Sequence, residues 1–568
     1  MKTIFQYTLS LVALICVGGC SILDQEPEVI TSDTYYQNES EFLYGLAGIY
    51  GAINNEELYG RCYSLPISNT DDLCYQNRVH NASAVYWYTH NASDADVLSA
   101  WRMLYAGIKN ANEFLEAVER SDFDQELKEQ YYEEARFLRA FYHFLLAQAW
   151  GDVPLRTKAT KSPDAQEVNL AATPQAEVLL WCVQEMEEAL PKLPVSLENA
   201  PSRVVQTTAA GILARVYLFM AGETVKPIKG LTKTNLYEKA AAWADFVIDS
   251  GLHQLNPDYS MVFKNMITDT YDKAYNESMW EADFLGNRSS ADKWSNGRIG
   301  DLIGLQSNSS ESDYDKWSCN YSYAQYNGSL KLWDLYWSDD RTDEEAKLET
   351  ITDARQAWNL PPYNYKGGTI NTVTYIPSKD KTPYVYNKVS TFDDPTVAVG
   401  IRNCGKWRRE VDLEGSQSAK NLYTGINFPI LRYSDVLLMY AEAENEVNGP
   451  SEELLGYVKQ VRDRAGVATR SYDEYATKES FRELVRNERG RELCFEALRK
   501  YDLIRWGIFV QAMRSYNQQT ADSRWEAGNN LASYALQTAN SVQAKHIYLP
   551  IPAKELGVNT ELKQNPMW

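Results

Sequence analysis

Apolar residues recur at helical spacing through most of this chain. In the stretch 131–149 they alternate at spacings of three and four residues, which places them in one stripe along an α-helix. The stripe is formed by Ala135, Leu138, Tyr142, Leu145 and Ala149. Gly151 and Pro154 follow directly, and they predict that the helix ends there.

The same pattern returns in pairs of segments that are joined by short connections. The predicted helical segments are 207–221 paired with 237–249, 432–447 paired with 452–464, and a further stretch over 478–506. Small residues such as Ala210 and Ala241 recur where facing helices would approach closely. Paired helices of this kind resemble tetratricopeptide units, although no strict 34-residue repeat is visible. The pattern predicts a mainly α protein with a tetratricopeptide-like helical-hairpin scaffold.

Helical periodicity weakens between about residues 255 and 425, where Gly, Asn, Ser, Tyr and Trp become frequent. Long, weakly periodic stretches inside a compact chain are uncommon and often functional. We therefore expect an irregular, loop-rich subdomain, with small β elements at extended segments such as 384–390 and 546–552. The predicted parts are 20–254 (helical), 255–425 (loop-rich and aromatic) and 426–568 (helical), forming one composite folding unit.

The N-terminus has the features of an export signal. Lys2 is followed by the apolar run 9–17, which is too short to span a bilayer. Val17-Gly18-Gly19-Cys20 resembles a bacterial lipobox, which implies removal of residues 1–19 and acylation of Cys20. Acyl chains stabilise membrane attachment by about 0.8 kcal/mol per buried CH₂, so they would anchor the mature chain without a transmembrane helix.

Charge and aromatic content narrow the function. The 568 residues include 77 Asp and Glu against 56 Lys and Arg, a net charge of −21. This balance argues against nucleic acid as a partner, because phosphates are neutralised by Lys and Arg. Tyr is frequent, with 39 residues against 16 Phe, and Trp reaches 15. Rings with a polar edge suit surfaces that bind partly hydrated ligands.

Cysteine and histidine patterns indicate neither a metal site nor a redox motif. The mature chain has no CxxC, and its five His form no HExxH. Cys182 and Cys494 lie in helical patterns and are expected to be buried free thiols. Cys62 and Cys74 flank a loop and could pair, but their spacing alone does not establish a disulfide.

Motifs for catalysis are also missing from the sequence. There is no GxSxG elbow, and residues 400–407 (GIRNCGKW) imitate a phosphate-binding loop in which Trp407 replaces the hydroxyl residue. We predict no catalytic residue. A glycosidase needs only two carboxylates, however, and 77 acidic residues leave that possibility open.

Several segments resemble the SusD/RagB family of outer-membrane nutrient-binding lipoproteins of Bacteroidetes. The segments are WRMLYAGIKNANEFLEAV (101–118), ARFLRAFYHFLLAQAWGDVPL (135–155), FPILRYSDVLLMYAEAENEV (428–447), VRNERGRELCFEALRKYDLIRWG (485–507), IYLPIPAKEL (547–556) and QNPMW (564–568). In this order they span nearly the whole mature chain. The resemblance implies a lipid-anchored protein on the outer face of the outer membrane, partnered with a SusC-like TonB-dependent transporter.

The resemblance further implies that the protein captures oligosaccharides, and we expect no cofactor. Peptide binding of the RagB type on the same scaffold is the main alternative, and a cryptic glycoside hydrolase is the second. A structural calcium ion among the Asp-rich loops is left open. Net acidity disfavours strongly anionic glycans, unless a local basic patch reverses that preference.

A sugar site combines aromatic faces with paired hydrogen-bonding groups. Two stretches, 69–91 and 294–326, have this mixture, and the resemblance assigns sugar contacts to the same two regions. The predicted ligand-binding residues are Asp71, Asp72, Arg78, Trp87, Tyr88 and Asn91 in the first stretch, and Trp294, Trp317, Tyr321 and Tyr323 in the second. Their exposed rings are expected to meet in one shallow cradle. Trp101 and Trp150 lie on helical patterns and are expected in the core.

Charged residues between 485 and 507 are interpreted as structural. Glu496 with Lys500 and Asp502 with Arg505 have the spacing of helix-face ion pairs. The remaining charges, Arg486, Glu488, Arg489, Arg491 and Glu492, are predicted to form a salt-bridge mesh between packed helices.

Overall fold

The structure is a computed structural model, and ten ranges of the chain are described. They are residues 35–78, 83–121, 124–162, 164–284, 296–307, 320–337, 353–361, 402–412, 422–522 and 532–568. Cys20 and the segment 384–390 lie outside these ranges. Every helix in the ranges is too short or too polar to cross a membrane.

Helices dominate the described residues, as the sequence predicts. The N-terminal helices are α3 (Glu39–Tyr50), α4 (Ala95–Arg120), α5 (Gln125–Trp150), α6 (Ala165–Val168), α7 (Gln175–Ala189), α8 (Gln206–Met220), α9 (Lys233–Asp249) and α10 (Tyr259–Ile267). Local sequence sets their limits. Asp94 caps α4 by accepting hydrogen bonds from the backbone N–H groups of Asp96 and Val97.

Among the described residues, the C-terminal helices are shorter and more numerous than the N-terminal ones. They are α12 (Leu330–Trp337), α14 (Ala354–Asn359), α15 (Tyr433–Asn448), α16 (Glu452–Arg464), α17 (Lys478–Leu493), α18 (Arg499–Arg505), α19 (Phe509–Arg514), α20 (Tyr516–Gln519), α21 (Ala532–Ser541) and α22 (Ala553–Val558). The short helical turns are η1 (Tyr63–Ile67), η2 (Ala84–Trp87), η3 (Leu190–Lys192), η5 (Gly405–Trp407), η7 (Tyr472–Tyr475) and η9 (Ala544–Ile547).

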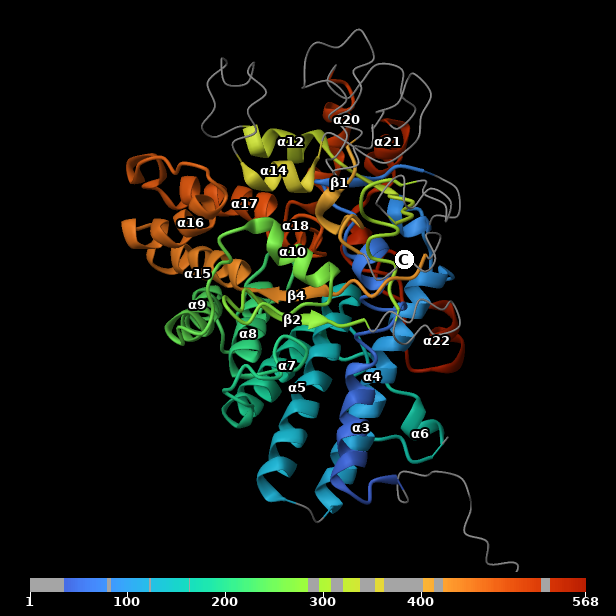
Figure 1. The fold of residues 1–568 in the computed structure, drawn as a ribbon. Coiled ribbons are helices and arrows are strands. Elements are labelled where there is room, and N and C mark those ends of the chain that lie inside the picture. Colours follow the sequence, from blue (N-terminus) through green and yellow to red (C-terminus); the bar gives the residue numbers. More distant parts are fainter. Residues whose placement is uncertain are drawn as a thin grey trace, which may run out of the picture.

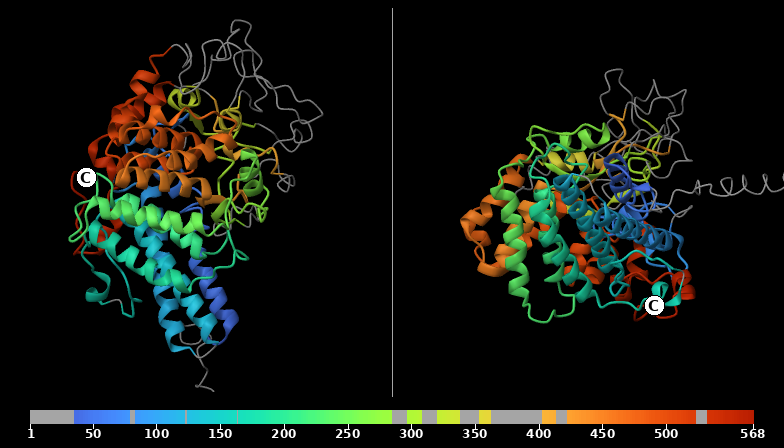
Figure 2. Two further views of the ribbon diagram at one scale, coloured as in Figure 1. Left: turned by 90° about the vertical axis from the view of Figure 1, so that its left-hand side faces the viewer. Right: turned by 90° about the horizontal axis from the view of Figure 1, so that it is seen from below.

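Successive helices form a layered scaffold, which confirms the predicted helical-hairpin architecture. Helix α4 packs on α5, α5 on α7, α7 on α8, α8 on α9, α9 on α15 and α15 on α16. Figure 1 shows this array from the blue α4 to the orange α16. In the left view of Figure 2, the orange α15 and α16 lie above the green α9. The buried apolar core runs from Phe42 to Leu562 and crosses the predicted boundaries near residues 255 and 425.

Two small antiparallel sheets connect distant parts of the chain. Strand β2 (Ser278–Ala282) pairs with β4 (Phe428–Arg432), with register shifts around Trp280. Strand β1 (Cys74–Gln76) pairs with β3 (Tyr326–Gly328).

The predicted continuous helix over 478–506 is wrong, because the chain breaks between α17 and α18. Phe495 and Ala497 have φ values of 67° and 61°, which an α-helix cannot contain. The break places the Glu496 carboxylate against Arg432 and Lys406 instead of Lys500. The Lys500 ammonium donates to the Ile67 carbonyl at 2.7 Å, so the predicted Glu496–Lys500 pair is also wrong.

The predicted β element at 546–552 is likewise absent. These residues lie against the C-terminal end of α5, where the Leu549 N–H donates to the Ala149 carbonyl at 2.8 Å and the Trp150 indole donates to the Pro550 carbonyl at 3.1 Å. Pro550 and Pro552 lack the N–H that a sheet ladder requires.

Other predictions about the interior are confirmed. Trp101 and Trp150 are buried, at 2% and 0% exposure. Cys182 and Cys494 are buried free thiols. Cys62 and Cys74 are also free, and their thiols are directed to the Asp96 carboxylate and the Asn69 carbonyl respectively.

The charged residues of α17 do form a buried mesh. The Glu492 carboxylate lies 3.2 Å from Arg355, 3.0 Å from Arg432 and 2.6 Å from Arg464. Glu488 joins it by accepting from Arg491 at 2.9 Å, and the predicted Asp502–Arg505 pair is present at 2.8 Å. Arg486 departs from the prediction, because its guanidinium lies over the Trp506 ring at 4.7 Å.

The close approach of α4 and α5 depends on Gly107. A Cβ atom there would lie 2.6 Å from Cε2 of Tyr142, whereas a Cβ at Gly48 on α3 would meet nothing within 4 Å. We expect Gly107→Ala to lower the free energy of unfolding by about 1–3 kcal/mol through overpacking. Gly48→Ala is the matched control and is expected to stabilise the helix by about 1 kcal/mol. Thermal unfolding of both variants measures the difference, and equal midpoints would contradict the packing argument.

Candidate functional site

The pairing of β1 with β3 brings the two predicted ligand-binding stretches together. Cys74 faces Gly328 and Gln76 faces Tyr326 in the ladder. The pairing continues beyond β1, where the Asn77 N–H donates to the Gln325 carbonyl at 2.8 Å. Figure 1 shows β1 in the upper part of the molecule, beside α20 and α21.

Arg78 follows β1 and reaches across to the second stretch. Its guanidinium donates to the Tyr323 carbonyl and, at 3.2 Å, to the Asn77 side-chain oxygen. The same guanidinium lies 5.8 Å from the centre of the Tyr323 ring. Partial burial lowers the pKa of Arg78, but an arginine so placed still carries its charge.

Tyr321 and Tyr323 form an edge-to-face pair with ring centres 5.0 Å apart. Both side chains are half-buried, so part of each ring faces solvent. Burial, together with the hydrogen bond to Tyr323, raises the pKa of Tyr321 to about 12. The phenol therefore remains protonated at neutral pH and can both donate and accept a hydrogen bond. We call Arg78, Tyr321 and Tyr323 the tyrosine platform.

Buried polar groups support the platform from below. Arg409 donates to the Tyr321 carbonyl at 2.6 Å and to the Asp412 carboxylate at 2.8 Å. The Asp301 carbonyl accepts from the Ser322 hydroxyl at 3.1 Å and from the Ala324 N–H at 3.0 Å. These hydrogen bonds fix the backbone around the two tyrosines before a ligand binds. Binding therefore loses less conformational entropy than it would on a flexible loop.

Trp87 and Tyr88 do not join the platform, and the prediction that they present exposed rings is wrong. Trp87 is 6% exposed, and Tyr88 is 2% exposed. The Tyr88 hydroxyl donates to the Thr70 carbonyl at 2.6 Å, and its ring packs against Phe509 and His546. Turn η2 directs both rings into the interior, where they fill space between the N-terminal segment and the C-terminal helices.

Asp71, Asp72 and Asn91 also have structural roles. Asp72 is fully buried and accepts from Arg499 at 2.9 and 3.1 Å and from Lys331. Burial alone would raise the pKa of Asp72, but these two cations outweigh it and lower the pKa well below the usual range. Burial beside Asp72 raises the pKa of Asp71 to about 7. Asn91 is exposed, and its side-chain oxygen accepts from the Ser93 N–H in the turn before α4.

Of the ten predicted residues, three meet in the tyrosine platform. Trp294 and Trp317 lie outside the described residues, so their contact with a ligand stays a prediction. Tyr534 of α21 is not among the predicted residues, although it is half-buried and close enough to Arg78 to influence the pKa of Arg78. Tyr534 follows Tyr323 by about 200 positions and lies on a helical pattern, so no local feature pointed to it.

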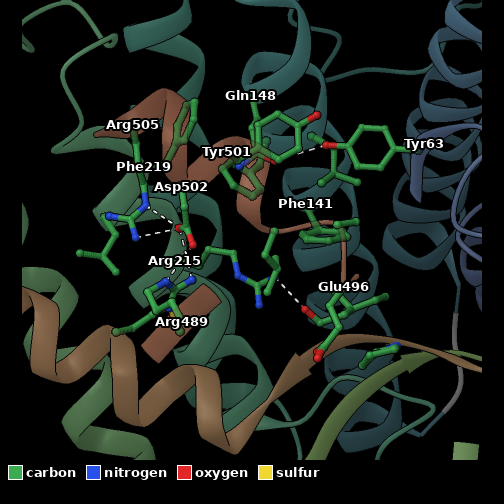
Figure 3. A pocket seen from close by; sticks show the side chains of 18 of the residues that line it. Tyr63, Phe141, Gln148, Arg215, Phe219, Arg489, Glu496, Tyr501, Asp502 and Arg505 are labelled. Carbon is green, nitrogen blue, oxygen red and sulfur yellow. Dashed lines mark hydrogen bonds and ion pairs between the residues drawn. The ribbon is translucent and has the colours of Figure 1, made fainter. Parts of the chain in front are cut away.

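A cavity in the helical core is a weaker candidate. It lies between α5, α8, α15 and α18 and has a volume of about 40 Å³. Figure 3 shows the ion pairs of Arg489 and Arg505 with Asp502 on one side of the cavity, Tyr501 near the centre and Tyr63 on the opposite side. Small-molecule sites usually have at least roughly 300 Å³, so this cavity is too small for a sugar ring.

Metal binding finds no support in the parts of the chain that the structure describes. No group of three or more His, Cys, Asp or Glu side chains is arranged there to hold an ion. The rings of His90 and His546 lie 5.3 Å apart but are surrounded by Tyr88, Trp568 and Lys545.

Comparison with known families decides the identity of the fold. The profile of the SusD family matches residues 276–568, which is more than half of the chain. The chain belongs to the SusD family. A second profile, described as starch-binding proteins associating with the outer membrane, matches residues 23–218. The membership accounts for the helical scaffold and for the order of the segments in the sequence.

Individual SusD-family relatives match over more than four fifths of their length. The SusD-like protein P2 of Formosa agariphila is 24% identical over 572 residues, covering 98% of each chain. A SusD-like protein of Bacteroides ovatus is 23% identical, covering 84% of this chain and 82% of its own.

Solved structures show the same fold. A SusD homologue from Bacteroides thetaiotaomicron superposes with a TM-score of 0.78 at 24% identity, covering 94% of this chain and 98% of its own. A laminarin-binding SusD-like protein has a TM-score of 0.66 at 20% identity, covering 94% of this chain and 100% of its own. Surface glycan-binding protein A from Bacteroides fluxus also has a TM-score of 0.66, at 18% identity and the same coverage.

Proposed function

We propose that this protein is a cell-surface glycan-binding lipoprotein that captures oligosaccharides by aromatic stacking on the tyrosine platform. The observation that carries the proposal is the β1–β3 pairing, which joins Arg78 with two half-exposed tyrosine rings. The names of two structural neighbours, one laminarin-binding and one glycan-binding, support it.

The chemistry of the platform suits a neutral sugar. The C–H face of a pyranose ring packs on an aromatic face, while its hydroxyls require both donors and acceptors. Tyr321 and Tyr323 offer rings and phenol hydroxyls, which can donate and accept hydrogen bonds, and Arg78 offers only donors. A half-exposed platform competes with water, so modest affinity is expected. None of the three platform residues is a carboxylate of the kind that a glycosidase uses, and we infer binding without catalysis.

The proposal also includes the attachment of the protein to the outer membrane and the delivery of the glycan to a transporter. Acylation of Cys20 would anchor the protein to the outer membrane, facing the exterior, where a SusC-like TonB-dependent transporter would receive the glycan. Metabolic labelling with a fatty acid tests the anchor, because Cys20→Ala is expected to abolish incorporation. Co-purification from membranes tests the transporter partnership.

Removal of both platform rings is the direct test of function. We expect Tyr321→Ala/Tyr323→Ala to weaken oligosaccharide binding at least about tenfold, which corresponds to ~1.4 kcal/mol. Titration calorimetry with a ligand selected on a glycan array measures the change. Tyr44→Ala is the matched control, because Tyr44 is 63% exposed on α3, away from the platform.

The alternatives give different results in the same experiments. If a peptide panel yields ligands and the glycan array yields none, the protein belongs with the RagB-type peptide binders. If chromatography detects shortened glycan after incubation, it is a hydrolase. If the double variant binds as tightly as the Tyr44 control, the platform is not the site.

A further inference from the structure

A second cleft lies between α4, the segment 154–168 and α22. Figure 1 shows α4, α6 and α22 at its lower right. Its volume of about 350 Å³ falls within the range of small-molecule sites. Tyr105, Pro154 and Leu562 are among the apolar and aromatic residues that line it. The Tyr105 hydroxyl donates to the Pro154 carbonyl at 2.8 Å, which fixes the ring in the wall.

The charge of this cleft is opposite to that of the whole chain. Four cationic side chains line it, together with one carboxylate, that of Glu555. The cations are Arg102, Lys109, Arg156 and Lys158. Acidic residues outnumber basic ones by 77 to 56 in the sequence, so a basic cleft does not follow from composition.

Three of the four cations are not neutralised by a carboxylate. Lys109 pairs with Glu113 at 2.8 Å. Arg156 directs its guanidinium to the backbone carbonyls of Glu167 and Val168, at 3.1 and 2.6 Å, which uses two of its five N–H groups and leaves its charge uncompensated. Arg102 and Lys158 are exposed, and neither has a hydrogen-bonded side chain or an ion pair with any described residue.

The backbone that carries Arg156 and Lys158 is held against α4. Asn112, which is 2% exposed on α4, donates its side-chain N–H groups to the carbonyls of Arg156 and Lys158, at 3.1 and 3.2 Å. The segment that carries two of the cations is thereby tied to the helix that carries Arg102. Like charges gathered around one cleft repel one another, and an anion in the cleft would relieve the repulsion.

We propose that this cleft binds an anionic sugar unit, with its carboxylate or sulfate held by Arg102, Arg156 and Lys158 and its ring lying over Tyr105. Guanidinium and ammonium groups are the usual partners of such oxyanions, and the ring adds an apolar face that a free inorganic ion would not use. The site is separate from the tyrosine platform, which lies beside β1, so the two proposals stand or fall independently. The cleft is a local basic patch, so it can attract an anionic glycan although the chain as a whole is acidic.

Titration calorimetry with three monosaccharides tests the proposal. We expect glucuronic acid and glucose 6-sulfate to bind at least about tenfold more tightly than glucose, with affinity falling as salt rises. Arg102→Gln/Lys158→Gln is expected to weaken binding of both acids at least about tenfold. Lys226→Gln/Lys229→Gln removes the same charge from two exposed lysines elsewhere and is expected to leave binding unchanged.

Several outcomes would overturn the proposal. Inorganic sulfate binding as tightly as glucose 6-sulfate would show that the cleft recognises charge alone. Equal affinities of the two double variants would place the acids elsewhere, and loss of acid binding in Tyr321→Ala/Tyr323→Ala would place them on the platform. Binding to vesicles of anionic phospholipid that depends on Arg102 and Lys158, with no binding of the sugar acids, would assign the cleft to a lipid headgroup.

Discussion

Replacing Glu492 by Gln is expected to lower the free energy of unfolding by about 3–5 kcal/mol. The Glu492 carboxylate is fully buried and lies within 3.2 Å of Arg355, Arg432 and Arg464. A neutral amide of the same shape would leave these three guanidinium groups without their shared counter-charge in a medium of low polarity. Removal of one partner from a buried ion pair has a cost of this size.

Urea unfolding followed by circular dichroism measures the change. Glu453→Gln is the control, because Glu453 is exposed on α16 and such substitutions usually alter stability by less than about 0.5 kcal/mol. A Glu492→Gln protein as stable as the Glu453→Gln protein would mean that the mesh contributes no net stability.

Acid is expected to unfold the protein abruptly below about pH 4.5. The responsible carboxyl groups are buried among arginine and lysine side chains. They are Asp72, Asp435, Glu442, Glu488 and Glu492. Burial alone would raise the pKa of each group, but the neighbouring cations outweigh it and lower all five pKa values to about 2 or below. Their stabilisation is present above the unfolded-state values of 3.8 and 4.5 and is lost as pH falls towards the folded-state values.

Each proton that the unfolded state binds in excess destabilises the fold by about 1.4 kcal/mol per pH unit. Between pH 6.5 and 4.5 the free energy of unfolding changes less steeply with pH, because two sets of titratable groups have opposite effects on it. Burial lowers the pKa of His90 to about 2 and of His143 and His546 to about 3, and it also lowers the pKa of His253, which destabilises the fold as pH falls below 6.5. Burial raises the pKa of Asp71 to about 7, of Glu281 to about 8 and of Asp283 to about 6, which has the opposite effect.

Urea unfolding at a series of pH values between 7 and 3 tests this profile. Glu442→Gln is expected to be less stable at pH 7. Between pH 4 and 3, the slope of its unfolding free energy against pH is expected to correspond to one proton fewer taken up on unfolding. If most of the stability is lost between pH 7 and 5.5, the histidines dominate and the explanation by carboxylates is wrong.

The helical scaffold could be predicted because its information is local. The stripe over 131–149 and the following Gly151 specify most of α5 without reference to any other segment. The interrupted helix at 478–506 could not be predicted in the same way. The left-handed residues Phe495 and Ala497 are compensated by ion pairs of Glu496 with Lys406 and Arg432, which are 64 to 90 positions away.

The candidate site, too, could be predicted from the sequence only in part. The two stretches were identified by their mixture of rings and polar groups, and Arg78, Tyr321 and Tyr323 do meet. Trp87 has the same composition around it and is nevertheless buried, because side-chain direction depends on turn η2 and on what packs against it.

By itself the sequence determined the helices, the family and the two segments that approach each other, since periodicity, caps and motif order are properties of neighbouring residues. Only the tertiary structure decided which rings face solvent and which charges stay unneutralised. The rings of Tyr88 and Tyr323 are equally aromatic, and the side chains of Arg102 and Arg432 are equally charged. Burial and counter-charge depend on segments that lie tens to hundreds of positions away, and no local pattern records them.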